Sequence, residues 1–167
     1  NNPLAAMVSI ISRNASGHLV FSNSTLKRNL RTYINEFRLI TDALDIVDAR
    51  IINLGVEYSI TVDATANKNL VLQKINNVLK EYLKVENFQI EQPIVLSDLI
   101  NIIINTDGVV SLVNFEIIGR NGVIDGRIYS TEGMSISFQT DRGVLYAPPG
   151  AIFEFKFPEN DIIGNCR

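Results

Sequence analysis

Residues 52–62 alternate between large apolar side chains and polar or small ones, and this feature constrains the fold more than any other. The stretch reads Ile-Asn-Leu-Gly-Val-Glu-Tyr-Ser-Ile-Thr-Val, with every even position apolar. A period of two held over this length predicts a β-strand with one solvated face and one buried face. We expect the helices nearby to cover the buried face.

Three segments are predicted to be helices. Their ranges are 24–37, 69–84 and 98–105. In the first two, apolar residues recur at three- and four-residue steps, which is typical of a helix that buries one side. We expect Ser24 or Thr25 to cap the first helix and Ser97 to cap the third, because hydroxyl side chains satisfy the free N–H groups of a first turn. Gly108 is expected to end the third helix.

The order strand, helix, helix, strand over residues 41–118 predicts one α/β core layer. Two successive helices reverse the chain twice, so the strands at 52–62 and 109–118 can lie antiparallel with both helices on one face. Residues 1–40 are a lead-in segment and the first helix, and residues 119–167 are short strands separated by glycine and proline turns. The predicted fold class is α+β: a small, mostly antiparallel sheet with helices packed on one face, plus a C-terminal β-rich arm.

Composition is that of a folded domain. The chain has 167 residues, is 46% hydrophobic and carries a net charge of −3. It is long enough to bury a core, and its charge predicts no general attraction to nucleic acid or to an anionic membrane. The single cysteine, Cys166, cannot form an internal disulfide, and no apolar run is as long as a membrane span. Since the chain does not begin with Met, we expect it to be part of a longer protein.

No residue pattern indicates a reaction centre. His18 is the only histidine, and no nucleophile motif lies near it. Asp42, Asp45 and Asp48 recur at three-residue spacing, but they lack the glycine and glutamate of a calcium-binding loop, which favours turn and capping roles. We therefore expect no enzyme, no catalytic residue, no cofactor, no metal site and no small-molecule substrate.

The first helix concentrates positive charge on one side. The basic residues are Lys27, Arg28, Arg31 and Arg38. This side is interpreted as a solvated face, as a surface that docks on an acidic protein, or as a nucleic-acid site, although aromatic residues that would stack on bases are not interleaved with it.

Near the C-terminus, Phe153, Phe155 and Phe157 alternate with charged residues. Either they belong to a strand that closes the local sheet, or they form an arm whose apolar face is completed by a neighbouring subunit. The candidate interface residues of the whole chain are Arg28, Arg31, Tyr146, Phe153, Phe155 and Phe157.

Several runs of the sequence together resemble one family. They are LKRNLRTY at 26–33, FRLITD at 37–42, IINLG at 51–55, QPI at 92–94, DGV at 107–109, and the closing runs at 152–158 and 161–164. In this order they resemble the C-terminal part of the baseplate wedge protein of contractile-tailed, T-even-like phages, the gene-six product type, which is related to baseplate J-like proteins. Residues 129–142 and 147–150 depart from the family pattern.

The resemblance implies a structural protein of the virion, located in the tail baseplate and assembled in the host cytoplasm. Members of the family pair with one another and join neighbouring wedges into a ring around the tail hub. On this basis we expect a homodimer that contacts other baseplate wedge proteins and binds neither nucleic acid nor membrane. The alternative function is a small ligand- or partner-binding α/β module, which predicts a concave apolar pocket with a few converging polar groups.

Overall fold

A computed structural model describes residues 5–37 and 43–167, and its fold is mixed α+β, as predicted. The chain divides into two compact units, residues 1–50 (unit 1) and residues 51–167 (unit 2). This grouping differs from the predicted boundaries after residues 40 and 118, because strands of the C-terminal segment belong to the main sheet of unit 2.

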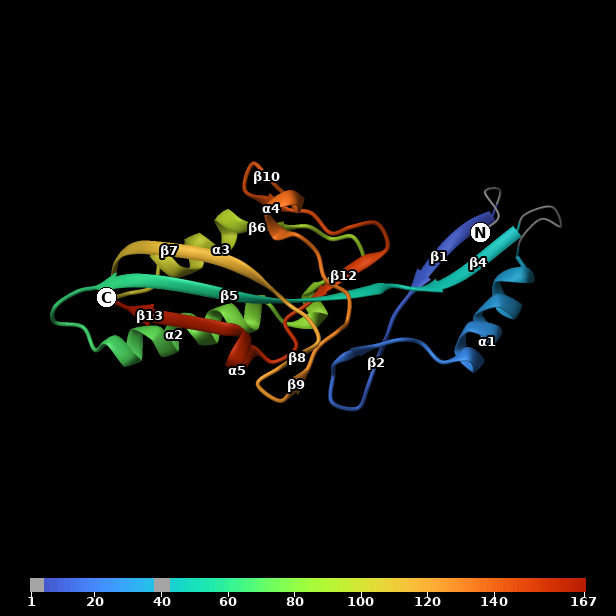
Figure 1. Ribbon diagram of the computed structural model, residues 1–167, viewed down its shortest axis with the longest axis horizontal. Coiled ribbons are helices and arrows are strands. Elements are labelled where there is room, and N and C mark those ends of the chain that lie inside the picture. The colour runs from blue at the N-terminus through green and yellow to red at the C-terminus, as the bar shows by residue number, and fades with distance from the viewer. Residues whose placement is uncertain (1–4, 38–42) are drawn as a thin grey trace. The chain divides into compact units, whose positions relative to one another are not determined.

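Unit 1 contains two parallel strands connected through a hairpin and a helix. Its elements are β1 (Ala5–Ile10), β2 (Ser12–Arg13), β3 (Leu19–Val20), α1 (Ser24–Asn35) and β4 (Ala43–Asp48). β1 pairs with β4 along its whole length, and α1 lies beside β4 (Figure 1). In the lead-in segment, β2 and β3 form a short hairpin. The segment predicted as a connector at 41–48 is thus a strand in its described part, and residues 41 and 42 lie outside the described residues.

The N-cap of α1 is Asn23, so the prediction of Ser24 or Thr25 was wrong. The Asn23 side chain accepts a hydrogen bond from the Leu26 N–H at 2.7 Å. Asparagine is as good an N-cap as serine, and its side-chain oxygen satisfies one of the free N–H groups of the first turn. The helix begins one residue after it.

Unit 2 is built on the long strand that the alternation predicted. Its elements are β5 (Arg50–Val62, whose first residue is the last of unit 1), α2 (Lys68–Tyr82), a 3₁₀ turn (Val85–Asn87), β6 (Ile94–Val95), α3 (Leu96–Ile104), β7 (Val109–Arg120), β8 (Val123–Ile124), β9 (Arg127–Ile128), α4 (Ile136–Gln139), β10 (Thr140–Asp141), β11 (Val144–Leu145), β12 (Ala151–Glu154), α5 (Pro158–Asp161) and β13 (Ile162–Cys166).

β5 is the central strand of this unit (Figure 1). β7 runs antiparallel to it, as predicted for the two long strands. β13 runs parallel to it, with Ile162 opposite Val56 and Cys166 opposite Ile60, and β12 also pairs with β5. The C-terminal segment therefore supplies two strands of the main sheet.

The prediction of one solvated and one buried face for β5 was correct only for its second half. Residues 51–56 are all buried, and burial alternates from Glu57 onward. The first half is covered on both faces, so that Asn53, a polar residue at a position expected to be solvated, is only 1% exposed. Hydrogen bonds inside the protein replace the water that this amide would otherwise bind.

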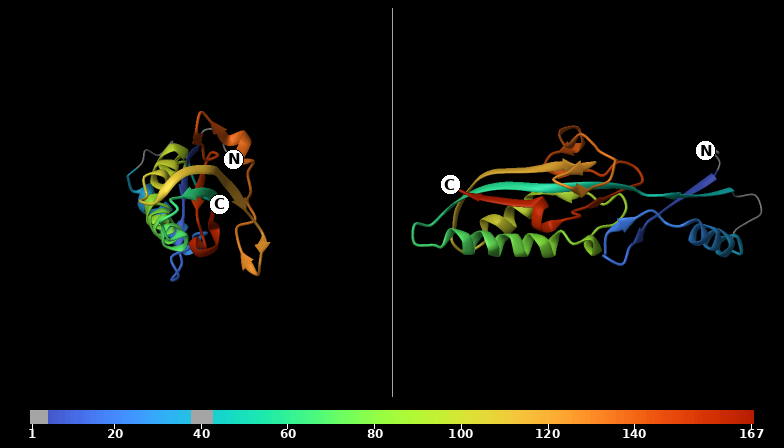
Figure 2. Two further views of the ribbon diagram at one scale, coloured as in Figure 1. Left: turned by 90° about the vertical axis from the view of Figure 1, so that its left-hand side faces the viewer. Right: turned by 60° about the horizontal axis from the view of Figure 1, so that its bottom comes forward.

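α2 and α3 cover one face of the sheet (Figure 2). α2 contacts β13 and α3, and α3 contacts β7. Their buried residues are Val71, Ile75 and Leu79 from α2, and Leu99 and Ile103 from α3. The prediction that Ser97 caps α3 was wrong, because the helix already begins at Leu96 and its N-cap position, Val95, has no side-chain cap.

The remaining strands of unit 2 form small sheets joined by tight turns. β11 lies between β10 and β6, so β6 is at an edge of this sheet, where the adjacent Pro93 is tolerated. β8 and β9 form a hairpin whose turn residues, Asp125 and Gly126, have φ values of 49° and 76°. Two successive positive φ values are typical of a type I′ turn, for which Asp-Gly is a preferred sequence.

Candidate functional site

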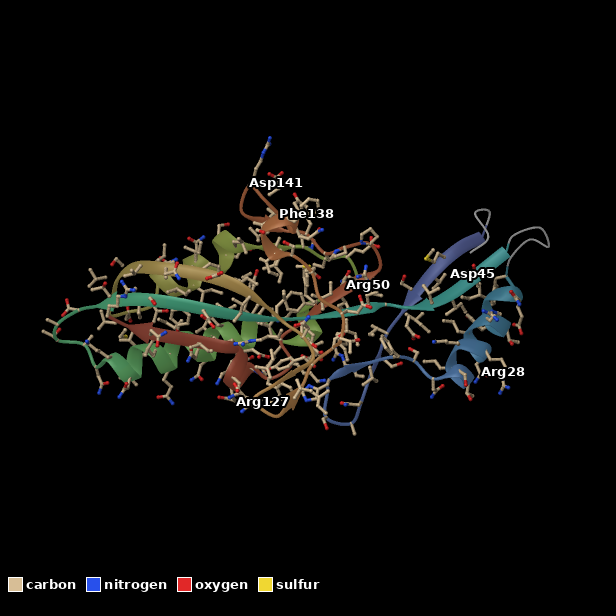
Figure 3. All side chains as sticks on the ribbon, viewed as in Figure 1. Arg28, Asp45, Arg50, Arg127, Phe138 and Asp141 are labelled. Atoms are coloured by element: carbon tan, nitrogen blue, oxygen red, sulfur yellow. The ribbon has the colours of Figure 1, made fainter. Side chains whose placement is uncertain are left out.

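The basic side of α1 is exposed, but it is smaller than predicted. Arg28 and Arg31 are exposed, and Arg28 extends from the helix into solvent (Figure 3). The Lys27 ammonium instead bonds the carboxylate of Asp48, which also accepts the Ser22 N–H at 3.0 Å. Arg38 lies outside the described residues. Within the described part of the helix, the positive charge that faces solvent therefore comes from two arginines.

The apolar side of α1 is exposed as well. No residue of the helix is buried. The side chains of Tyr33 and Phe37 are 61% and 74% exposed, and their rings touch each other with centroids 5.1 Å apart. A helix with this apolar spacing normally buries that stripe. In unit 1 the Tyr33 and Phe37 part of the stripe is therefore exposed, whereas Leu30 and Ile34 are half-buried.

The phenylalanine stripe of the C-terminal segment lies mostly in the core of unit 2. Phe153 is fully buried in β12, and the buried ring of Phe155 has its centroid 6.1 Å from that of Phe88. Phe157 is half-buried and stands edge-on to Tyr129, with ring centroids 5.3 Å apart. This geometry favours the first of the two alternatives, a strand that closes the local sheet. A role of these three residues in contacting a neighbour stays a prediction.

Glu154 differs from the predicted stripe. It was expected on the solvated side opposite the phenylalanines, but all four residues of β12 are buried. Its carboxylate accepts a hydrogen bond from the Asn53 side-chain amide at 2.8 Å, and the Asn53 side-chain oxygen accepts the Ser130 N–H at 2.7 Å. These bonds satisfy polar groups that are enclosed because β12 packs on both faces.

Tyr146, the remaining candidate interface residue, lies just after β11 and is about half exposed. Its N–H bonds the Gln139 carbonyl at 3.0 Å, which places it beside the end of α4. Phe138 of α4 is 84% exposed and, like Asp141 of β10, projects from this part of unit 2 (Figure 3). The two aromatic residues give the small sheet an exposed apolar surface that the sequence analysis found only through Tyr146.

A buried polar cluster joins the C-terminal segment to the sheet. Asp161 is fully buried, and its carboxylate accepts hydrogen bonds from the Tyr129 hydroxyl at 2.6 Å and from the Phe157 N–H at 2.8 Å. Arg120 Nε lies 3.7 Å from the same carboxylate, and Arg120 Nη2 lies 4.0 Å from Glu57 Oε1. Burial, followed by the bond to Asp161, raises the pKa of Tyr129 to about 12. This geometry satisfies and locks the buried carboxylate, which gives the cluster a structural role.

The aspartates considered as metal ligands in the sequence do not form a metal site in the described structure. Within the described residues, no three histidine, cysteine, aspartate or glutamate side chains lie close enough together to hold a metal ion. Of the three predicted aspartates, Asp42 lies outside the described residues and Asp48 is engaged by Lys27. No helix in the described part of the chain is long and apolar enough to cross a membrane.

Two surface pockets test the alternative function. One, of about 180 Å³, is lined by Tyr82, Asn87, Phe88, Gln92, Pro93 and Ile94. It is smaller than the roughly 300–1,000 Å³ of a typical ligand pocket. A second pocket, of about 520 Å³, is large enough but mainly polar, with Asn53, Gly119, Arg120, Asn121 and Ser135 among its lining residues. The first pocket combines an apolar wall with polar side chains but is small, and the second is large but mainly polar, so neither joins the predicted lining to the size of a typical ligand pocket.

Comparison with known proteins finds a related family. Residues 54–129 match the family model described as the Baseplate J-like protein C-terminal domain. The match covers just under half of the chain and lies within unit 2, from β5 to the end of the β8–β9 hairpin. It supports a family of phage baseplate proteins, and with it a structural role in the virion tail. No curated protein matches the chain.

Proposed function

We propose that this chain is a structural component of the baseplate wedge of a contractile phage tail. In this role it associates with a second copy of itself and contacts other wedge proteins, so that neighbouring wedges form a ring around the tail hub. The observation that carries the proposal is the match of residues 54–129 to the baseplate J-like C-terminal domain. The matched residues include most of the central strand β5 and both helices that cover the sheet.

The distribution of buried and exposed residues supports an assembly function. Unit 2 has a closed core in which β5, α2, α3 and β12 are all represented. Unit 1 exposes apolar residues of α1 and the arginines Arg28 and Arg31. Exposed apolar side chains rimmed by polar ones are typical of protein–protein contact sites. A component of a ring needs a stable fold, which unit 2 supplies, and exposed surfaces that bind its neighbours, which unit 1 supplies.

The proposal includes a non-enzymatic role. Several polar groups enclosed in unit 2 bond each other, as Asp161 does with Tyr129 and Glu154 with Asn53, whereas Arg120 Nε is buried without a hydrogen-bond partner among the described residues. Buried groups that are hydrogen-bonded in this way stabilise the fold. We further propose that the protein is assembled in the host cytoplasm and resides in the tail baseplate of the virion.

Immuno-electron microscopy tests this function. Antibodies raised against the purified chain are expected to label the baseplate end of tails in virions of the phage that encodes it. Antibodies that were absorbed with the purified chain serve as the control for non-specific labelling. Virions that carry no label at the baseplate, even after tails are partly disassembled with denaturant to expose covered epitopes, would contradict the proposal.

A further inference from the structure

The outer edge of β1 is an unprotected strand edge. β1 pairs with β4 on one side, and no other described strand lies beside it. Its sequence, Ala-Ala-Met-Val-Ser-Ile, contains no charged residue and no proline. Natural proteins normally protect such an edge with lysine, proline, a bulge or a covering segment, since a bare edge pairs with strands of other chains.

Unit 1 also lacks the core that its fold requires. In its described part, the buried residues are Leu19, Ser22, Ile46 and Ala49. Parallel strands are usually buried on both faces, and a sheet of two strands is marginal without further strands or a larger apolar face. Additional strands beside β1 would relieve both deficits, because they would satisfy the free backbone groups and widen the sheet.

The charges of the two edge strands show which edge can meet its own copy. β4 carries Asp45 and Asp48, so antiparallel pairing of two β4 edges would bring aspartates of the two chains together. Like charges across neighbouring strands destabilise the pair. β1 has no such obstacle. Two copies of this chain can therefore pair through their β1 edges, whereas pairing through their β4 edges is disfavoured.

We propose that β1 pairs antiparallel with β1 of a second copy, giving a continuous four-stranded sheet in the order β4, β1, β1 and β4. The twofold axis that relates two antiparallel copies of one edge is perpendicular to the sheet, so the interface is isologous and both α1 helices lie on the same face. This inference rests on the self-association included in the proposed function, and it names the surface that performs it.

Met7 is a suitable position at which to test this pairing by substitution. Because side chains alternate along a strand, Met7 and its partner Asp45 lie on the face opposite that of Val8, Ile46 and Asp48. α1 covers the latter face, where Lys27 bonds Asp48. Met7 is 60% exposed. A change of this side chain therefore leaves the contacts of α1 in place.

The symmetry limits the register. Opposite residues of antiparallel strands share a face, so β1 pairs with its copy about Met7 or about Val8 when most of the strand is used. In the first register, Met7 faces Met7 of the second copy. In the second register it faces Ser9 and lies diagonal to the other Met7, still within reach of a long side chain. In both, charges at position 7 of the two chains interact.

The experiment compares the 167-residue chain with Met7→Lys and Met7→Glu by sedimentation velocity, alone and mixed in equal amounts. We expect the wild-type chain to dimerise and each variant alone to have a dissociation constant raised about tenfold or more. The mixture is expected to recover the dimer, and native mass spectrometry should show one chain of each kind in it. The matched control is Ile128→Lys, a similarly exposed apolar residue on the β8–β9 hairpin, which should dimerise like the wild type.

Each contrary result has a distinct meaning. Dimers of Met7→Lys as stable as the wild type, or a mixture that stays monomeric, would overturn β1 pairing. A wild-type chain that is monomeric at high micromolar concentration would also overturn it, and would leave the β1 edge to a strand of a different chain. Neither result removes the baseplate role, which is decided by labelling of virions. Circular dichroism spectra identical to the wild type confirm that the variants are folded.

Discussion

At the scale of single residues, Asp161 is contacted by three separate segments of unit 2. Its carboxylate receives bonds from the β8–β9 hairpin region through Tyr129 and from the segment before α5 through Phe157, and it faces Arg120 at the end of β7. A carboxylate that is fully removed from water is tolerated only when it is paired and hydrogen-bonded in this way. Its role therefore follows from its partners.

The substitution Asp161→Asn removes the negative charge of this residue while keeping the shape of its side chain, so it tests the contribution of the charge to stability. The amide has the same shape: its oxygen can accept from the Phe157 N–H, and its NH2 group can donate to the Tyr129 oxygen. It leaves the mostly buried Arg120 without its nearest anion. We expect the free energy of unfolding to fall by about 3 kcal/mol, the lower end of the cost of breaking a buried ion pair. Urea denaturation measures this change. The control is Glu159→Gln, an exposed carboxylate in the same short helix, expected to change stability by no more than about 0.5 kcal/mol. Equal effects of the two variants would refute the argument.

The raised pKa of Tyr129 predicts that the stability of the protein changes at alkaline pH. Its pKa is raised from 10.0 to about 12 in the folded protein, so the neutral hydroxyl is favoured by folding. The stabilisation is fully present below the pKa of the unfolded chain and is lost as pH rises through that of the folded one. The difference in unfolding free energy between wild type and Tyr129→Phe should therefore be constant below about pH 9 and shrink between pH 10 and 12. A difference that does not vary with pH over this window would show that the hydroxyl is not held neutral.

These residues could not be found from the sequence. Asp161, Tyr129 and Arg120 are far apart along the chain, and none lies in a local motif. The local sequence around Asp161, a short turn that begins with Pro158, does not indicate whether the aspartate is exposed or buried. By contrast, Arg28, Arg31 and Tyr146, which the sequence singled out, are exposed, and their role in an interface stays a prediction.

At the scale of elements, the parts that the sequence predicted are those with long periodic patterns. β5, α2 and β7 were placed within a few residues, and the antiparallel pairing of β5 with β7 follows from the two helices between them. β1 and β4 were not predicted as partners, because parallel pairing across a helix leaves no mark on either strand. β12 was misread for a related reason: alternation of phenylalanine with charge suggests one wet face, whereas Glu154 is enclosed.

The pairing of β13 with β5 depends on a glycine. Gly164 lies opposite Tyr58, and a Cβ at this position would overlap the Tyr58 ring and approach Leu72 Cδ2 to 2.9 Å. Tyr58 cannot easily yield, because it is buried and its hydroxyl donates to Asn76 Oδ1 at 2.7 Å. We expect Gly164→Ala to lower the unfolding free energy by about 1–3 kcal/mol, the usual cost of overpacking.

Gly119→Ala is the matched control for this prediction. Gly119 also lies in a strand beside β5, but a Cβ there would meet nothing closer than 3.9 Å. Its stability should stay within about 0.5 kcal/mol of the wild type, or increase slightly because alanine restricts the unfolded chain. Thermal unfolding followed by circular dichroism ranks the two variants. If Gly119→Ala is the more destabilising of the two, the close approach of β13 to Tyr58 is not what stabilises this edge.

At the scale of the whole molecule, the two units differ in how completely each buries its apolar residues. Unit 2 contains most of the fully buried large side chains, among them Tyr58, Phe153 and Leu99. Unit 1 has few buried residues in its described part and a helix with none. Burial of apolar area is the main source of stability, so unit 2 is expected to fold without unit 1, whereas the reverse is not.

A fragment of residues 51–167 tests this division together with the assembly function. We expect it to unfold cooperatively in urea, because its main sheet, covering helices and buried polar cluster are all retained. We also expect it to sediment as a monomer at concentrations where the 167-residue chain is dimeric, because β1 has been removed. A folded fragment that still dimerises would place self-association on unit 2, with the exposed aromatics Phe138 and Tyr146 as the next surface to vary. Urea unfolding measures whether unit 2 folds alone, and sedimentation measures whether it associates. The two experiments therefore test the division into units and the pairing through β1 independently.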